Sequence, residues 1–78
     1  MAETPVITSE IVEHLGVLSV NGKWKKEINI VKWGDNAPKY DIRPWNEDHS
    51  KASKGLTFTG DELTELRRIL DGIDELNG

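Results

Sequence analysis

The chain has 78 residues and contains no cysteine, one tyrosine and one phenylalanine. Without cysteine, disulfide bonds and thiolate metal sites are excluded. No apolar run approaches the about 20 residues of a membrane-spanning helix, and residues 1–10 lack the basic-then-apolar layout of a signal peptide. With 36% hydrophobic and 6% aromatic residues, one small domain builds only a small core, which leaves self-association as the route to further burial. These absences favour a soluble, cytoplasmic protein.

The formal net charge of −4 is distributed unevenly along the chain. Residues 1–21 carry acidic side chains and no basic one, and residues 56–78 are also acidic on balance. Residues 22–55 hold eight of the ten lysines and arginines. Because a phosphate responds to the local field rather than to the net charge, this central segment can present a basic face on an acidic molecule.

The centre of the chain shows the alternation typical of β-strands. Residues 1–10 have no clear period and predict a flexible N-terminal arm, so the folded domain is expected over residues 11–76. Asn21-Gly22 is the preferred pair for a two-residue type I′ hairpin, because both central residues of that turn need positive φ. Alternating polar and apolar side chains predict strands at about 14–20, 24–33, 39–45 and 56–59.

A helix is expected after the last strand, over about residues 60–75. Thr59 and Glu62 have the spacing of a capping box, and Gly72 predicts a kink. The sequence therefore predicts an α+β fold, a four-stranded antiparallel sheet followed by one C-terminal helix. The apolar stripe of this helix is wider than one thin sheet covers, so we expect a homodimer held together through Leu63, Leu66, Ile69, Leu70, Ile73 and Leu76.

Nothing in the sequence favours catalysis. No serine lies in a nucleophile-elbow context, and the isolated glycines form no phosphate-binding loop. His14 and His49 are expected in a strand and a loop with no reason to meet. The run Glu47-Asp48-His49 could hold a cation, but adjacent residues are not at ligand spacing, and a solvated loop is favoured. Asp41 is expected to be ion-paired. We therefore expect no enzyme, metal, cofactor or small-molecule substrate.

Two tryptophans share a predicted sheet face with basic side chains, on the face opposite the apolar residues. Trp33 shares its strand face with Lys25, and Trp45 shares one with Lys39 and Arg43. Basic strands with aromatic rings on which bases stack are typical of proteins that bind single-stranded nucleic acid. The alternative is that both tryptophans line the rim of the core or a dimer contact, and the spacing leaves the two interpretations open.

The order of these elements also carries a resemblance. Its parts are the Trp33-Gly34 turn, the strand Tyr40-Asp41-Ile42-Arg43, the loop end Ser53-Lys54-Gly55, the strand Leu56-Thr57-Phe58-Thr59 and a Glu-Leu-x-x-Leu helix starting at Glu62. Together they resemble the DNA-binding domain of the transcriptional coactivator positive cofactor four, especially its bacterial YdbC-type members. The resemblance covers about residues 14–75.

The resemblance implies a curved four-stranded sheet with a kinked helix, paired as a homodimer that binds single-stranded or unwound DNA with little sequence preference. By position, it implies base stacking at Trp33 and at or beside Trp45, a backbone contact at Arg43, and a basic loop at Lys54. Pro44 departs from the family pattern. Charge, spacing and resemblance together give the expected nucleic-acid-binding residues Lys25, Lys26, Lys32, Trp33, Lys39, Arg43, Trp45, Lys51 and Lys54.

The expected function is therefore binding of single-stranded DNA in transcription regulation or DNA maintenance, at the nucleoid of the cytoplasm. Two alternatives stay open. A single-stranded RNA-binding protein would use the same surface. A protein–protein interaction module would use the tryptophans as anchors for a partner.

Overall fold

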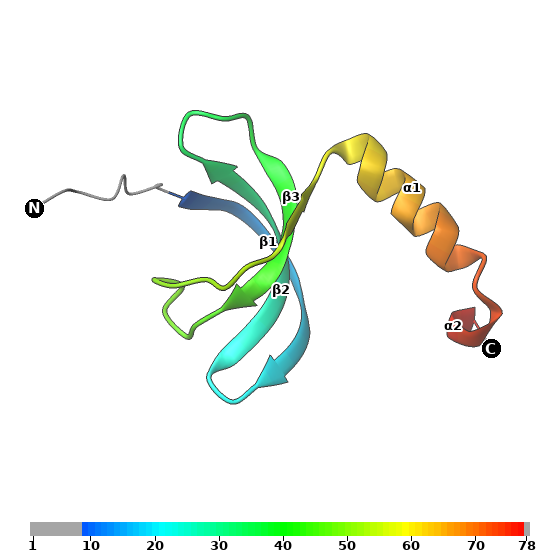
Figure 1. Cartoon of the computed structure of the whole chain (residues 1–78), viewed down its shortest axis with the longest axis horizontal. Coiled ribbons are helices and arrows are strands. Elements are labelled where there is room, and N and C mark those ends of the chain that lie inside the picture. Colours follow the sequence, from blue (N-terminus) through cyan, green and yellow to red (C-terminus); the bar gives the residue numbers. More distant parts are fainter. Residues whose placement is uncertain (1–8, 78) are drawn as a thin grey trace, which may run out of the picture.

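The computed structural model describes residues 9–77 as a four-stranded antiparallel sheet followed by a C-terminal helix, which confirms the expected fold (Figure 1). The strands pair in the order β1-β2-β3-β4. Residues 1–8 of the expected arm lie outside the described residues, whereas Ser9 and Glu10 belong to the first strand. The elements are β1 (Ser9–Asn21), β2 (Trp24–Trp33), β3 (Lys39–Trp45), β4 (Leu56–Phe58), α1 (Gly60–Asp71) and α2 (Asp74–Asn77).

Strand β1 is longer than expected, and it contains three regularly spaced irregularities. Its register runs Ile11↔Val31, His14↔Asn29 and Val17↔Glu27, so every third residue of β1 meets every second residue of β2. A bulge of this kind leaves one residue unpaired and increases the local bend and twist of the strand. The unpaired residues are the exposed apolar side chains Val12, Leu15 and Leu18.

These bulges accompany a sheet that is strongly curved (Figure 1). Lys25 pairs with Trp45, and Trp33 lies eight residues further along β2, which in a straight strand would be roughly 26 Å away. The two indole rings nevertheless lie with their centroids 6.4 Å apart. The curvature therefore brings the two ends of one sheet face together. We call this face, which carries Glu27, Asn29, Val31, Trp33, Asp41, Arg43 and Trp45, the concave face.

The turn between β1 and β2 differs by one residue from the expected type I′ hairpin. Asn21 pairs with Trp24, so the two-residue loop consists of Gly22 and Lys23 rather than of Asn21 and Gly22. Within the described residues only Gly22 of this loop has positive φ, at 63°. A glycine with positive φ in the first central position is the pattern of a type II′ turn, which also matches the twist of the hairpin.

Helix α1 extends from the convex side of the sheet (Figure 1). The Thr59 hydroxyl accepts from the Glu62 N–H at 3.1 Å, and the Glu62 carboxylate accepts from the Thr59 N–H at 2.8 Å, so the predicted capping box is confirmed. Gly72 ends α1, and a short α2 follows the break. No residue of α1 is buried in the single chain. An apolar hollow between α1 and the sheet is lined in part by Leu18, Ile28, Ile42, Leu63, Leu66 and Leu70.

The loop between β3 and β4 folds back along β3. Ala52 bridges to Trp45, and the Ser53 N–H donates to the Pro44 carbonyl at 3.0 Å. Gly55 then approaches β3 so closely that a Cβ atom would lie 2.2 Å from the Ile42 carbonyl oxygen and 2.3 Å from the Arg43 Cβ. No helix among residues 9–77 is long and apolar enough to cross a membrane.

Gly55→Ala should therefore destabilise the protein by about 3 kcal/mol, because the added methyl group meets backbone atoms that cannot rotate away. The matched control is Gly16→Ala, where the new Cβ would meet only Ile28 Cγ2 at 3.9 Å, an ordinary contact. Urea unfolding followed by circular dichroism measures both variants. Equal stabilities for the two would contradict the close approach at Gly55.

Candidate nucleic-acid interface

The two tryptophans of the concave face form a stacked pair. Their ring planes are 14° apart, and the guanidinium carbon of Arg43 lies 4.4 Å from the centroid of the Trp33 ring. Offset-stacked rings and a cation over an indole face are both favourable arrangements. Trp45 is only 2% exposed, whereas Trp33 remains partly open to solvent. The indole that a nucleobase can reach from solvent is therefore that of Trp33, with Trp45 packed against it.

Arg43 is fixed in place by Asp41 as well as by Trp33. Its Nε and Nη2 atoms donate to the two carboxylate oxygens of Asp41 at 2.7 and 2.6 Å. Asp41 has no exposed surface, and the side chain of Arg43 is 16% exposed. The ion pairing expected for Asp41 is confirmed. Arg43 thus presents a rigid, planar guanidinium edge at the concave face, since bidentate pairing leaves it little freedom.

A hollow of about 400 Å³ lies beside the Trp33 ring. Lys39 and Arg43 supply positive charge to it, and Thr57 of β4 supplies a hydroxyl. Lys39 pairs with the buried Val31, which places it on the concave face together with Lys25, the partner of Trp45. The complete lining is Trp33, Asn36, Ala37, Lys39, Arg43 and Thr57.

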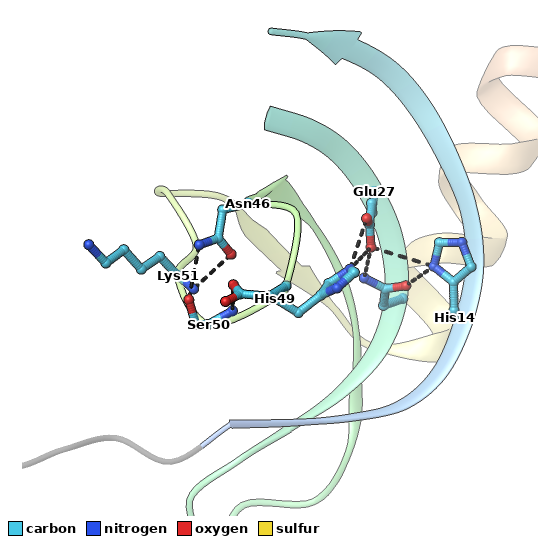
Figure 2. Close-up of polar contacts among 8 residues, drawn as sticks. His14, Glu27, Asn46, His49, Ser50 and Lys51 are labelled. Atoms are coloured by element: carbon cyan, nitrogen blue, oxygen red, sulfur yellow. Dashed lines mark hydrogen bonds and ion pairs between the residues drawn. The ribbon is translucent and has the colours of Figure 1, made fainter. Parts of the chain in front are cut away.

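The other expected basic residues lie elsewhere. Lys26 pairs with Pro44 and lines a hollow with the exposed Trp24, on the convex face. The Lys32 ammonium donates to the Gly34 carbonyl at 2.8 Å and supports the turn after Trp33. Lys51 and Lys54 are exposed in the β3–β4 loop, and the Lys51 side chain extends away from the sheet (Figure 2). The structure thus groups Lys25, Lys39 and Arg43 with the tryptophans and separates Lys26 from them.

A polar cluster that no sequence pattern indicated surrounds the Glu27 carboxylate and reaches Trp45 through His49. Glu27 is 2% exposed, and its carboxylate accepts from Asn29 Nδ2 at 3.1 Å (Figure 2). His49 Nε2 lies 3.0 Å from both carboxylate oxygens, and His14 Nδ1 lies 3.5 Å from one of them. Burial alone would raise the pKa of Glu27. The hydrogen bonds from Asn29 and His49 and the nearby charge of both imidazoles outweigh it, so the pKa lies below the usual value.

The expectation that His14 and His49 would not meet is wrong, because both contact the same buried carboxylate. In a hairpin without bulges, His14 would face Val31. Two bulges shift it by two residues, to Asn29 and the neighbourhood of Glu27. His49 reaches the same place from the β3–β4 loop, with a left-handed backbone at φ 60°.

The His49 loop is more ordered than the solvated loop expected from Glu47-Asp48-His49. The Asn46 side-chain oxygen accepts from the Lys51 N–H at 3.0 Å, and Asp48 accepts from the Ser50 N–H at 3.0 Å (Figure 2). Such side-chain caps stabilise tight turns. In the part of the chain that the structure describes, no three histidine, aspartate or glutamate side chains are placed to hold a metal ion.

Comparisons of the sequence with known proteins found a family and a relative. The family model for "Transcriptional Coactivator p15 (PC4)" matches residues 20–69, from the end of β1 to the last turns of α1. An uncharacterized protein of Treponema pallidum (strain Nichols) is 38% identical over 65 residues, which cover 82% of this chain and 76% of the relative. That family is a non-enzymatic one associated with binding of single-stranded DNA and with coactivation. By its sequence, the chain belongs to the Transcriptional Coactivator p15 (PC4) family.

Proposed function

We propose that this protein binds single-stranded DNA with little sequence preference, as a homodimer in the cytoplasm, and acts in transcription regulation or DNA maintenance. The observation that carries the proposal is the hollow beside Trp33, which joins an accessible indole face to the charges of Lys39 and Arg43. A base stacked on one aromatic ring contributes about 1–3 kcal/mol, whichever base it is. Lys39 and Lys25 would meet the phosphates on either side.

Several features favour a single strand over a duplex. Reading a duplex groove commonly needs a basic helix or ribbon that fits into it. In α1 the first turn is acidic, and Arg68 is paired with Glu65 through its guanidinium. The basic side chains of the concave face instead surround a curved surface with an aromatic ring, which suits a flexible strand whose bases are unstacked.

The surface of the single chain supports the homodimer. Ile69 on α1 is 49% exposed, and the bulge residue Leu18 is 58% exposed beside the apolar hollow of the convex side. So much apolar surface is a cost for a small chain and favours contact with a second copy. Two copies paired through this side would leave both concave faces free and would give one strand a longer track. Leu56 and Leu70 are further exposed apolar residues on this side, and Leu76 of α2 is exposed as well.

Trp33→Ala should weaken binding of an oligothymidine by about 1–3 kcal/mol while the protein stays folded, because it removes the accessible stacking surface. Fluorescence anisotropy of a labelled oligomer measures the affinity, and circular dichroism checks the fold.

The matched control is Trp24→Ala, which removes an exposed tryptophan from the opposite face of the same strand. This variant should bind normally. An equal loss in both variants, or no loss in Trp33→Ala, would count against the concave face as the interface.

A further inference from the structure

We propose that His49 is a positioning residue of the nucleic-acid face, which holds the Trp45–Trp33 pair in place through Glu27 with a grip that tightens when its imidazole is protonated. This inference rests on the proposed function, since it concerns regulation of the same face by pH. It gives a role to the polar cluster around Glu27, a cluster that direct contact with DNA does not require.

A continuous series of contacts joins the buried carboxylate to the accessible indole. His49 Nε2 lies 3.0 Å from both oxygens of Glu27, and the His49 ring lies 5.6 Å from the Trp45 ring, centroid to centroid. Trp45 in turn stacks on Trp33 at 6.4 Å. Because Trp45 is almost fully buried, its ring is fixed by these neighbours. If His49 moves, Trp45 loses a neighbour that fixes its ring, and Trp45 is the ring that supports Trp33.

The backbone of His49 adopts an uncommon conformation. Its φ of 60° is the one positive value at a non-glycine residue between Ser9 and Asn77. Left-handed backbone is uncommon for residues other than glycine, although asparagine, aspartate and histidine adopt it more often than the rest, and it persists where the surroundings stabilise it. The contacts of the His49 ring with Glu27 and Trp45 supply that stabilisation.

Protonation of His49 would strengthen its contact with Glu27. The Glu27 carboxylate only accepts hydrogen bonds, so the Nε2 atom of His49 carries a proton already, and a second proton at Nδ1 makes the ring a cation. Hydrogen bonds between charged partners are shorter and stronger than those with a neutral donor. Imidazoles change charge between about pH 5 and pH 8. Across that range the lowered pKa of Glu27 keeps its carboxylate ionised.

Charged and polar groups from each neighbouring element face the Glu27–His49 pair. From β1, His14 Nδ1 lies 2.7 Å from the Asn29 side-chain oxygen and 3.5 Å from the carboxylate, and from β2 the Asn29 side-chain nitrogen donates to the carboxylate. From β3, the register partner of Glu27 is Arg43, whose guanidinium is already paired with Asp41. From the loop, Glu47 and Asp48 are exposed neighbours of His49. The His14 and His49 side chains are 52% and 40% exposed, so solvent reaches both imidazoles.

The first test follows the free protein without DNA. In a Trp24→Phe background, the fluorescence of Trp33 and Trp45 should fall between about pH 8 and pH 6, because a protonated imidazole against an indole quenches its emission. His49→Asn should abolish this response, since asparagine tolerates left-handed backbone and does not titrate. His14→Asn is the matched control, because it removes the imidazole that faces Glu27 from β1 and leaves in place the His49 ring against Trp45, so it should keep the response.

The second test measures binding of an oligothymidine, whose bases do not titrate in this range. The wild type should bind about fivefold more tightly near pH 6 than near pH 8, because a stronger His49–Glu27 contact holds the tryptophan pair ready for binding in a larger fraction of the molecules. His49→Asn should show nearly equal affinities at the two pH values. Glu27→Gln keeps the size of the buried side chain and removes its charge, and it should also lose the pH dependence.

Fluorescence that does not change with pH in the wild type, or a wild-type response in His49→Asn, would overturn the inference. The inference would also be overturned if His14→Asn lost the fluorescence response to pH while His49→Asn kept it. If the fluorescence follows His49 as expected but the oligomer does not bind at either pH, the proposed function fails, while the grip of His49 on the tryptophans is supported.

Discussion

Arg43→Ala is expected to lower the free energy of unfolding by about 3–5 kcal/mol, because it leaves a buried carboxylate without its partner. Asp41 has no exposed surface, and both of its oxygens accept from Arg43. The variant also removes the cation that packs on Trp33. Urea unfolding is the measurement, and adding Asp41→Asn to Arg43→Ala should recover part of the loss, because the buried group is then uncharged.

The matched control for Arg43 is Arg68→Ala on helix α1. Arg68 also pairs with a carboxylate, that of Glu65, but both side chains are exposed. Exposed pairs of this kind contribute less than about 1 kcal/mol. If Arg43→Ala costs no more than Arg68→Ala, the buried pair does not stabilise the fold as described. The unfolding measurement is also needed to interpret DNA binding. Weaker binding by Arg43→Ala indicates a lost contact between Arg43 and DNA only if that variant is still folded.

Ile69→Glu is expected to separate the proposed homodimer and to weaken binding of single-stranded DNA by about tenfold or more, although Ile69 lies on the helix and not on the concave face. Ile69 is 49% exposed and does not line the hollow between α1 and the sheet, so the single chain should stay folded. A charge at this position would be buried without a partner in the dimer, which is strongly unfavourable.

Analytical ultracentrifugation measures the assembly, with Thr64→Glu as the matched control. Thr64 is an exposed polar residue of the same helix, so the same charge there should leave the dimer intact. A wild-type protein that sediments as one chain while it binds DNA at full strength would contradict the dimer.

Local patterns in the sequence predict most of the elements, because the physics involved is local. The Thr59–Glu62 capping box needs only a few neighbouring residues, and it is present as expected. The alternation in β2 correctly places Glu27 and Trp33 on one face and Ile28 on the other, because side-chain direction in a strand has period two.

The curvature of the sheet could not be predicted in this way. The three bulges of β1 depend on how the strand pairs with β2, and an unbulged hairpin would place His14 two residues away from its observed partner. The meeting of His14 and His49 at Glu27, and the burial of Trp45, follow from that curvature and from the return of the β3–β4 loop. The sequence contains one signal for the bulges, which is an apolar residue at every third position: Val12, Leu15 and Leu18.

The most direct test of the central claim compares a single strand with its duplex. The wild type is titrated with an unlabelled oligonucleotide and, separately, with the same oligonucleotide annealed to its complement, while tryptophan fluorescence is followed at low and moderate salt. We expect the single strand to bind at least about tenfold more tightly, with an affinity that falls as salt rises because bound phosphates release counterions. Equal affinity for the duplex and for the single strand, or binding that does not respond to salt, would contradict this account.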